Sequence, residues 1–349
     1  MISLKDHLSH QQVEASAPCR IDSGGTWDIK AMALPLQGIE PVTVNIALNV
    51  RTSALLSPYD DGWVKISSEG FSHAEAFPKG NMPFNSPFGL FLGAISYFGF
   101  HGLEVHIRSH SPVRAGLGGS STALVALVTA LAKVSVKLGG KKLSANEILH
   151  LAYQLEDSLS GGNCGLQDHA AAVYGGVNQW KWRYGNPSNP LERIPLLDRK
   201  GQKELSKRLL VAYSGKSHVS ARTNRNWIKA FLSGSTRAQW IRVNEIVHHL
   251  ARAIEGQDWK NAACLIREEM AERKKITPVA LIPITTKLVD QAEREGCGAR
   301  FAGAGAGGSL WALGELENIR RLRETWEKTL APAKDAKVLD CEVDPAGVR

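Results

Sequence analysis

Three features are scarce or missing in this sequence, and each absence excludes a class of protein. The 349 residues include only five cysteines, scattered and without a Cys-x-x-Cys pair, so neither a disulfide framework nor a zinc knuckle is supported. The longest apolar stretch, near Leu124, ends at Lys133 and is too short to span a bilayer. The first residues are polar and lack the apolar segment of a secretion signal. We therefore expect a cytoplasmic protein with no membrane partner.

Positive charge predominates, but it is not concentrated. Lys and Arg number 42 against 34 Asp and Glu, which gives a formal net charge of +8. This balance favours anionic ligands such as nucleotides and sugar phosphates. The densest basic stretch, from Arg267 to Lys275, is interleaved with glutamates and is typical of a solvated helix face, so we expect no nucleic-acid partner. With 43% hydrophobic and 22% charged residues, the chain is globular and can form an ample core.

The most informative segment runs from Pro112 to Thr122 and reads PVRAGLGGSST. After it, apolar residues recur at three- and four-residue spacing between Leu124 and Val134, which predicts a helix. At the start of a helix, free N–H groups and the positive end of the dipole attract phosphate, and glycines let it approach the backbone. An ordinary capped helix start is the alternative. The segment is not a Walker A loop. The predicted nucleotide-binding residues are Pro112, Gly116, Leu117, Gly118, Gly119, Ser120 and Ser121.

Two further segments carry glycines, namely residues 17–28 and residues 303–308. In the first, a predicted strand leads into Gly24 and Gly25, and Asp28 follows with a carboxylate that suits a polyhydroxy ligand; a plain turn is the alternative. The second reads GAGAGG. The three segments together resemble, in order and spacing, the three motifs of the GHMP kinases, the group that contains galactose, homoserine and mevalonate kinases. The resemblance covers nearly the whole chain.

The sequence departs from the motifs of these kinases at two positions. Cys19 stands where many members have Gly, and Ala306 interrupts the third glycine run; we expect each to narrow the space near the active site. Residues 24–28 and 161–176 carry a narrower resemblance, to the sugar 1-kinases that act on D-glycero-D-manno-heptose 7-phosphate and on L-fucose.

The resemblance implies an α+β fold with two lobes, an N-terminal ribosomal protein S5-like lobe over 12–190 and a C-terminal ferredoxin-like lobe over 205–345, with ATP and Mg²⁺ bound in the cleft between them. From local pattern we expect a capping box at Ser144 to Glu147 and a hinge or surface loop over 181–203. The pattern predicts strands at 42–48, 63–66, 103–107 and 208–213. It predicts helices near 86–99, 120–138, 144–159, 236–255, 258–274, 284–295 and 315–330.

The resemblance also assigns catalytic and metal-binding roles. Asp168 is expected to accept or orient the proton of the sugar hydroxyl, and a helix cap is the alternative. Arg20 is expected to lie beside the reacting hydroxyl, where it would favour ionised Asp168; pairing with Asp22 is the alternative. We expect Mg²⁺ to be bound by the Ser120 hydroxyl and the Glu156 carboxylate. The alternative metal ligands are Ser121 and Asp157, and an acid on a helix surface remains another explanation of Glu156.

Substrate contacts are expected from residues in all three motifs and from one further loop. Asp28, Gly24 and Gly25 would hold the sugar, and Gly305 would pack near it or near the phosphate loop. Lys216, His218 and Arg222 follow a predicted strand and would hold a phosphate already on the sugar; a solvated loop is the alternative.

The predicted reaction is ATP-dependent phosphorylation of the anomeric hydroxyl of a sugar or sugar phosphate, with heptose 7-phosphate converted to the 1,7-bisphosphate as the leading case. A kinase of L-fucose or another neutral sugar is one alternative. A sugar-sensing regulator without activity is another. A homodimer is left open.

Overall fold

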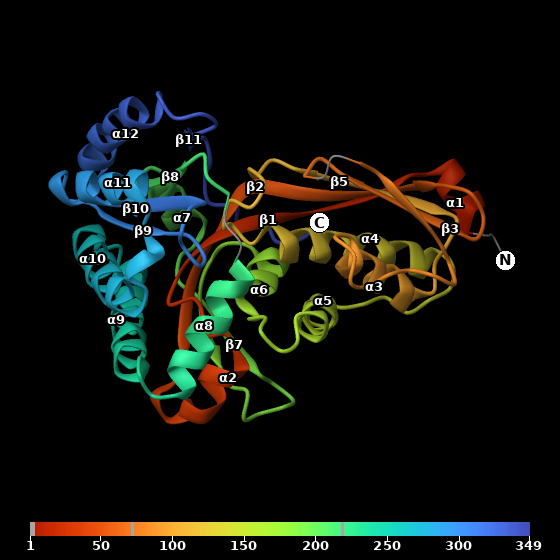
Figure 1. Ribbon diagram of the computed structural model, residues 1–349, viewed down its shortest axis with the longest axis horizontal. Helices are drawn as coiled ribbons and strands as arrows, with labels where there is room; N and C mark the ends of the chain where they lie inside the picture. Colours follow the sequence, from red (N-terminus) through yellow and green to blue (C-terminus); the bar gives the residue numbers. More distant parts are fainter. Residues whose placement is uncertain (1–3, 71–72, 218–219) are drawn as a thin grey trace.

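The chain folds into two α+β lobes, as the computed structural model in Figure 1 shows. The structure describes residues 4–70, 73–217 and 220–349, without the side chains of 220–222 and 279. Each lobe is built around one sheet. The larger sheet uses strands between Val13 and Pro195, and the smaller uses strands between Leu209 and Leu339.

The first lobe contains a seven-stranded sheet centred on the long strand β2 (Val42–Pro58). One edge of β2 pairs with β1. The other edge pairs with β6 at residues 42–46 and with β5 at residues 52–58. The sheet order is β4-β3-β5-β2-β6-β7, with β1 paired to β2, and among the described residues of this sheet only β3 and β5 pair in parallel. The remaining strands are β1 (Val13–Ser23), β3 (Trp63–Ser68), β4 (Glu75–Pro78), β5 (Leu103–Ser109), β6 (Val177–Trp182) and β7 (Leu191–Pro195).

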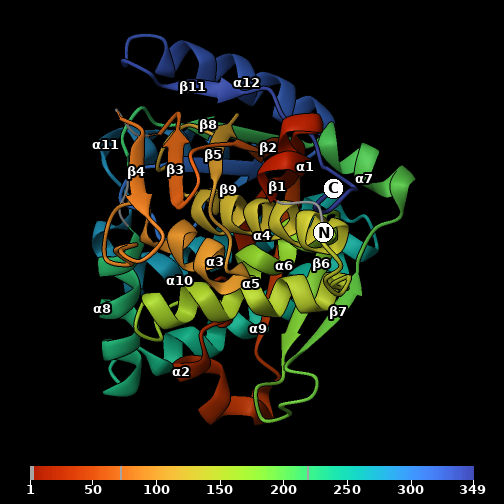
Figure 2. The ribbon, with the colours of Figure 1, turned by 90° about the vertical axis from the view of Figure 1, so that its right-hand side faces the viewer.

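Helix α4 (Gly119–Lys137) is the central core helix of this lobe. Figure 2 shows α4 and α5 (Ala145–Leu159) running beside each other under the sheet. By length and composition α4 would be able to span a membrane, so our estimate of a too-short run was wrong, but 72% of its apolar window is buried inside the protein. Its apolarity is explained by this packing. The other helices of the lobe are α1 (Leu4–His10), α2 (Lys30–Ala33), η1 (Leu34–Ile39), α3 (Gly89–Phe98), α6 (Gln167–Tyr174) and α7 (Arg199–Ser206).

The second lobe has a four-stranded antiparallel sheet in the order β11-β8-β10-β9. Numbered within the lobe, this is fourth, first, third and second, the order of the expected ferredoxin-like arrangement. The strands are β8 (Leu209–Tyr213), β9 (Gly298–Phe301), β10 (Ser309–Leu313) and β11 (Lys337–Leu339). The helices are α8 (Ser220–Leu232), α9 (Arg237–Glu255), α10 (Trp259–Ile276), η2 (Pro278–Ala280), α11 (Pro283–Arg294) and α12 (Leu316–Leu330).

Local signals predicted most elements, and one segment was assigned wrongly. The capping box at Ser144 and Glu147 is present. The segment 181–203 is not a hinge, because it contains β7 and the start of α7. Strand β7 pairs antiparallel with β6, and the buried Leu191, Leu196 and Leu197 fix it to the core. Gly185, Pro187 and Pro190 lie in the turn of the β6–β7 hairpin, and Pro195 ends β7.

The last residues of the chain return to the first lobe. Val343 forms a β-bridge with Leu48 in β2. Arg51, from the same strand, pairs with Asp344 at 2.5 Å and donates to the carbonyl oxygen of Gly347 at 2.9 Å. The C-terminal segment is thereby fixed to the first sheet although the preceding strand belongs to the second.

A buried cluster of charges joins the two lobes. Arg300, in β9, lies 3.4 Å from Asp22 in β1 and 3.4 Å from Glu269 in α10. Arg273, one helical turn after Glu269, donates to it at 2.9 Å and stacks over the Trp240 ring at 4.3 Å. All four charged side chains are 2% exposed or less. Because each charge is removed from water, its opposite neighbour is needed to hold it there.

We predict that Arg300→Ala lowers the free energy of unfolding by about 3–5 kcal/mol, because it leaves Asp22 and Glu269 buried without this cation. Urea denaturation measures the change. Arg320→Ala is the control, since Arg320 pairs with Glu317 where both side chains are more than 60% exposed, and it is expected to cost less than about 1 kcal/mol. Equal effects of the two substitutions would contradict a stabilising role for the buried cluster.

Candidate functional site

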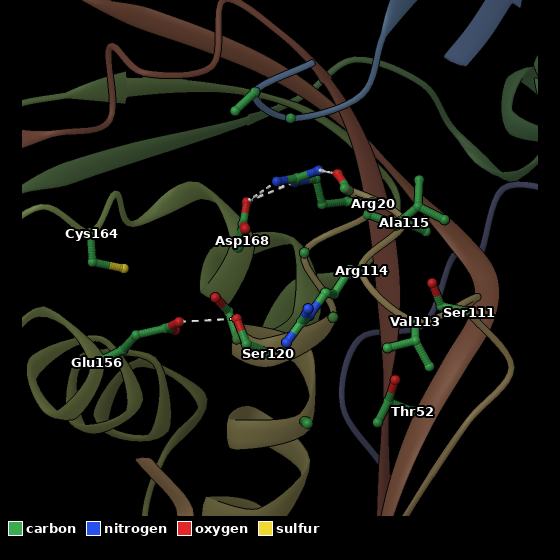
Figure 3. Close-up of a pocket in the computed structure, with 18 of the residues that line it drawn as sticks. Arg20, Thr52, Ser111, Val113, Arg114, Ala115, Ser120, Glu156, Cys164 and Asp168 are labelled. Carbon is green, nitrogen blue, oxygen red and sulfur yellow. Dashed lines mark hydrogen bonds and ion pairs between the residues drawn. The ribbon is translucent and has the colours of Figure 1, made fainter. Parts of the chain in front are cut away.

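A cleft of about 1180 Å³ lies between the lobes. Its walls come from β1, from the segment before α4, from the α5–α6 region, from α8 and from the loop between β9 and β10. Figure 3 shows Asp168, Glu156, Ser120 and Arg114 around it. Three segments far apart in the sequence therefore meet at one site.

The segment before α4 has the backbone that phosphate binding requires. Gly116 and Gly118 have φ values of +77° and +78°, and Gly118 is the N-cap of α4 without any side-chain cap. Only glycine adopts this conformation without strain. The first N–H groups of α4 therefore remain available for a ligand.

The third glycine segment holds this loop in place through backbone contacts. A Cβ on Gly303 would lie 2.9 Å from the carbonyl oxygen of Gly116, and a Cβ on Gly116 would lie 2.9 Å from that of Ala302. Nearby, the N–H of Ser309 donates to the carbonyl oxygen of Ala115 at 2.7 Å. Side chains at these glycines would push the two segments apart.

Arg20 connects the segment before α4, residues 112–118 (the phosphate loop), to Asp168. Its Nε and Nη2 both lie 2.7 Å from Oδ1 of Asp168, while Nη1 donates to the carbonyl oxygen of Gly116 at 2.8 Å. The alternative partner Asp22 is also within reach, at 3.5 Å. Burial acts to lower the pKa of Arg20, but Asp168 and then Asp22 outweigh it and raise that pKa. The guanidinium is therefore always charged.

Glu156 is held by two neighbours, one on each carboxylate oxygen. Ser120 donates to Oε1 at 3.1 Å, and Nε2 of His169 lies 2.8 Å from Oε2. Burial alone would raise the pKa of Glu156, but His169 and the Ser121 and Ser120 hydroxyls lower it below its ordinary value. An ionised carboxylate beside a hydroxyl is the oxygen donor set that suits Mg²⁺.

The alternative metal ligand Asp157 is placed less well. It lies 3.5 Å from the Lys30 ammonium and accepts from the backbone N–H of Cys164, and it is not among the residues that line the cleft.

Asp28 lines the cleft near Asp168 but is 3% exposed. Its carboxylate accepts from the backbone N–H of Thr26 at 2.8 Å and of Gln167 at 3.0 Å. Burial and then the Asp168 charge raise the pKa of Asp28 to about 6, against these two hydrogen bonds. The carboxylate is oriented by backbone and keeps lone pairs for a further donor.

Several residues expected at the substrate are not brought to the cleft. Gly24 faces Val247, and Gly305 packs against Ala280, because both glycines fill tight contacts in the second lobe. Lys216 is exposed and does not line the cleft.

Four further expectations concern positions at the margin of the site. His218 lies outside the described residues, as does the Arg222 side chain. Cys19 and Ala306 do not narrow the site: Cys19 is fully buried in the core, Ala306 is exposed, and neither lines the cleft.

Other cleft residues escaped the sequence analysis. Arg114 and Arg225 bring positive charge to its walls, and Cys164 lies next to Glu156, as does His169, which is fully buried behind the cleft lining. Arg225 belongs to α8, a helix that the pattern did not predict. An apolar end of the cleft, away from Asp168, is lined by Leu90, Phe91, Ile107 and Val113.

Comparison with known proteins gives consistent similarities. Residues 89–176 match the family model described as the GHMP kinases N terminal domain. The mevalonate kinase of Pyrococcus horikoshii is 24% identical over 298 residues, 76% of this chain and 80% of the relative. The structure of Lactococcus lactis galactokinase complexed with galactose has a TM-score of 0.72 at 17% identity and covers 99% of this chain and 98% of its own. A D-glycero-D-manno-heptose 1-phosphate kinase from Bacteriodes thetaiotaomicron has a TM-score of 0.70 at 17% identity, with 97% and 98% covered.

Two adjacent glycines allow the loop backbone and the ligand contact to be tested separately. Gly118→Ala is expected to destabilise the unliganded protein by about 1–2 kcal/mol, since it forces a left-handed backbone on alanine. Gly119 lies in the first turn of α4, and a Cβ there meets no protein atom within 4 Å. Gly119→Ala should leave the stability within about 0.5 kcal/mol.

Nucleotide binding should nevertheless become weaker in the Gly119→Ala variant. A methyl group that holds a phosphate away from one N–H loses a charge-assisted hydrogen bond of about 1.5–3 kcal/mol, which is roughly a ten- to hundredfold weaker Kd. Thermal unfolding and calorimetric ATP titration measure the two effects. Unchanged ATP affinity in Gly119→Ala would remove the first turn of α4 from the phosphate site.

Proposed function

Because the chain is similar to the GHMP kinases in sequence and fold, we propose that it is an ATP-dependent kinase that uses Mg²⁺ and that it phosphorylates the anomeric hydroxyl of a sugar phosphate. The observation that carries the proposal is the contact of Arg20 with both Asp168 and the Gly116 carbonyl. It brings a carboxylate suited to a hydroxyl proton beside the backbone suited to a polyphosphate. D-glycero-D-manno-heptose 7-phosphate is the substrate we propose first.

The two ends of the cleft suit the two ends of ATP. The apolar end at Leu90, Phe91 and Ile107 offers flat contacts to a base, and the start of α4 offers N–H groups to the phosphates. Ser120 and Glu156 would hold Mg²⁺, which when bound offsets negative charge on the phosphates. We choose the Ser120 hydroxyl as the Mg²⁺ ligand, and not that of the buried Ser121, because Ser120 is exposed to the cleft.

Asp168 and Arg20 have different roles at the reacting hydroxyl. Asp168 accepts or orients the hydroxyl proton, which requires the ionised carboxylate. Arg20 holds that carboxylate through its Nε and Nη2 and would place positive charge where the transferring phosphoryl group develops negative charge. The Asp168 side chain is 22% exposed, whereas that of Arg20 is 6% exposed, so the acid is the member of the pair that meets the substrate.

The acceptor end of the cleft favours a polyhydroxy compound with an anionic group. Asp28, Asn163 and Gln167 supply hydrogen-bonding groups around Asp168, as sugar hydroxyls require. Arg225, from α8, adds a cation to the same cleft. A phosphate on the sugar would neutralise it, and this favours a phosphosugar over a neutral sugar such as L-fucose.

Mevalonate is the second candidate acceptor. It is favoured by the curated relatives, among them the mevalonate kinase of Pyrococcus horikoshii. Its carboxylate would also find a partner in Arg225. The carboxylate of Asp28, which is buried and lines the cleft, suits a hydroxyl donor better than a second anion, and this supports the sugar.

A panel of acceptors tests the proposed activity. With ATP and Mg²⁺, heptose 7-phosphate should be converted to a 1,7-bisphosphate, and turnover should exceed that of L-fucose, galactose and mevalonate. Asp168→Asn is expected to lower kcat by about 10²–10⁴-fold while ATP binding is retained. The result is measured by the consumption of ATP and by phosphorus NMR of the product. No turnover with any acceptor would favour the sensing regulator, and preferred turnover of mevalonate would overturn the sugar assignment.

Alanine substitution of two cationic residues, one inside the cleft and one outside it, tests whether the acceptor sugar carries a phosphate. Arg225→Ala removes a charge-assisted hydrogen bond of about 1.5–3 kcal/mol, so the KM for the phosphosugar should rise roughly tenfold or more while the KM for ATP is unchanged. Lys216→Ala, outside the cleft lining, should leave both values unchanged. Steady-state kinetics decide between them, and a larger effect at Lys216 would restore the original assignment of the phosphate to that loop.

A further inference from the structure

Three side chains of different chemistry converge next to the predicted magnesium position. A carboxylate oxygen of Glu156, the thiol of Cys164 and an imidazole nitrogen of His169 all lie within 4.8 Å of one another. In the part of the chain that the structure describes, no other group of at least three such residues comes as close. Figure 3 shows the Cys164 thiol and the Glu156 carboxylate on the same side of the cavity, opposite Arg114.

The imidazole of His169 and the carboxylate of Glu156 contact one another at this corner, but Nδ1 of His169 has no hydrogen-bond partner among the described residues. His169 is fully buried, and among the described residues neither of its ring nitrogens makes a hydrogen bond of good geometry, although Nε2 lies 2.8 Å from Oε2 of Glu156. That Oε2 atom is likewise without a hydrogen bond. Buried nitrogen and oxygen atoms are rarely left in this state. A cation bound beside them would be coordinated by both Nε2 of His169 and Oε2 of Glu156 in place of their present contact.

The donor set selects the kind of cation. Mg²⁺ prefers oxygen ligands throughout, and Oε1 of Glu156 with the Ser120 hydroxyl already offers those. Imidazole nitrogen and thiolate sulfur instead favour zinc and similar thiophilic ions. Three protein ligands also leave a fourth position open for water or for a phosphate oxygen.

Cys164 needs only a small movement to complete such a site. Its thiol at present donates weakly to the carbonyl oxygen of Gly165 at 3.2 Å. The residue lies in the connection between α5 and α6, after Gly161 and Gly162, which both have positive φ. Zinc–sulfur and zinc–nitrogen bonds of about 2.3 Å and 2.0–2.1 Å require the Cys164 thiol to move toward the imidazole and the carboxylate, which already lie 2.8 Å apart.

We propose that Glu156, Cys164 and His169 form a binding site for Zn²⁺, and that Zn²⁺ and Mg²⁺ exclude one another because they share Glu156. On binding, the thiol releases its proton to solvent and the thiolate coordinates the ion. Zn²⁺ therefore inhibits phosphoryl transfer. Inhibition rests on the proposed function, whereas binding of the ion does not.

Binding is tested on the full chain without nucleotide. Zn²⁺ is titrated against a chromogenic chelator, and Co²⁺ serves as a spectroscopic probe, since a thiolate ligand gives an intense near-ultraviolet charge-transfer band. The wild-type chain should bind a single ion with that band. Cys164→Ser should abolish the band, and both Cys164→Ser and His169→Gln should weaken Zn²⁺ binding by about 10–100-fold.

Cys264→Ser is the matched control. Cys264 is an exposed cysteine beside Arg267, and it should leave the band and the affinity unchanged. If the band persists in Cys164→Ser, or if the wild-type chain binds no stoichiometric Zn²⁺, the site does not exist. Should the buried His169→Gln variant fail to fold, Cys164→Ser still decides the question.

The shared ligand is tested through competition. Raising Mg²⁺ should weaken Zn²⁺ binding to the nucleotide-free chain, and in kinase assays Zn²⁺ should inhibit competitively with Mg²⁺, less strongly in Cys164→Ser. Binding of Zn²⁺ that is independent of Mg²⁺ would overturn the sharing of Glu156. Absence of kinase activity with every acceptor would refute the proposed function but would leave the metal-binding result standing.

Discussion

The site depends on an unbroken series of buried opposite charges that begins in the cleft and ends inside the second lobe. The series alternates in sign through Asp168, Arg20, Asp22, Arg300, Glu269 and Arg273. Three cations and three anions balance, which is the condition under which such groups tolerate burial. Asp22 shows the balance: burial would raise its pKa, but Arg300, Arg20 and Arg273 hold that pKa below its ordinary value. Asp168 is thereby connected, through alternating charges, to the interior of the second lobe.

The glycines of the third motif, residues 303–308, also lie where the two lobes meet, and they make backbone contacts there instead of ion pairs. We expected them to lie near the phosphate loop or the substrate. Gly303 packs directly against Gly116, and Gly308 against Ala115, whereas Gly305 faces Ala280. Their common effect is to let the second lobe approach the phosphate loop closely. The third motif therefore shapes the loop that meets the ligand, and most of it does not meet the ligand itself.

The sequence predicted those features that depend on neighbours along the chain. Helix α4 and the capping box of α5 follow from periodicity and from one four-residue signal. Strand β7 was missed because its signal is short and its stability comes from pairing with β6 and from Leu191. The charge series was invisible for the same reason: its contacts form only in the folded chain, and Asp22 is more than 200 residues away from both Glu269 and Arg300. Only the resemblance linked Arg20 to Asp168, and no pattern pointed to Arg225.

The first turn of α6 explains why the acid and the metal corner are coupled. Successive residues of a helix point about 100° apart, so Asp168 faces Arg20 while His169, its neighbour, faces Glu156 on α5. The T-shaped contact of His169 with Tyr153, 5.9 Å between ring centroids, fixes the imidazole from the other side. A rotation of α6 that improved one contact would worsen the other. Asp168 and the Glu156 carboxylate beside Ser120 are thus held at a set separation through one rigid element, as the proposed phosphoryl transfer would need.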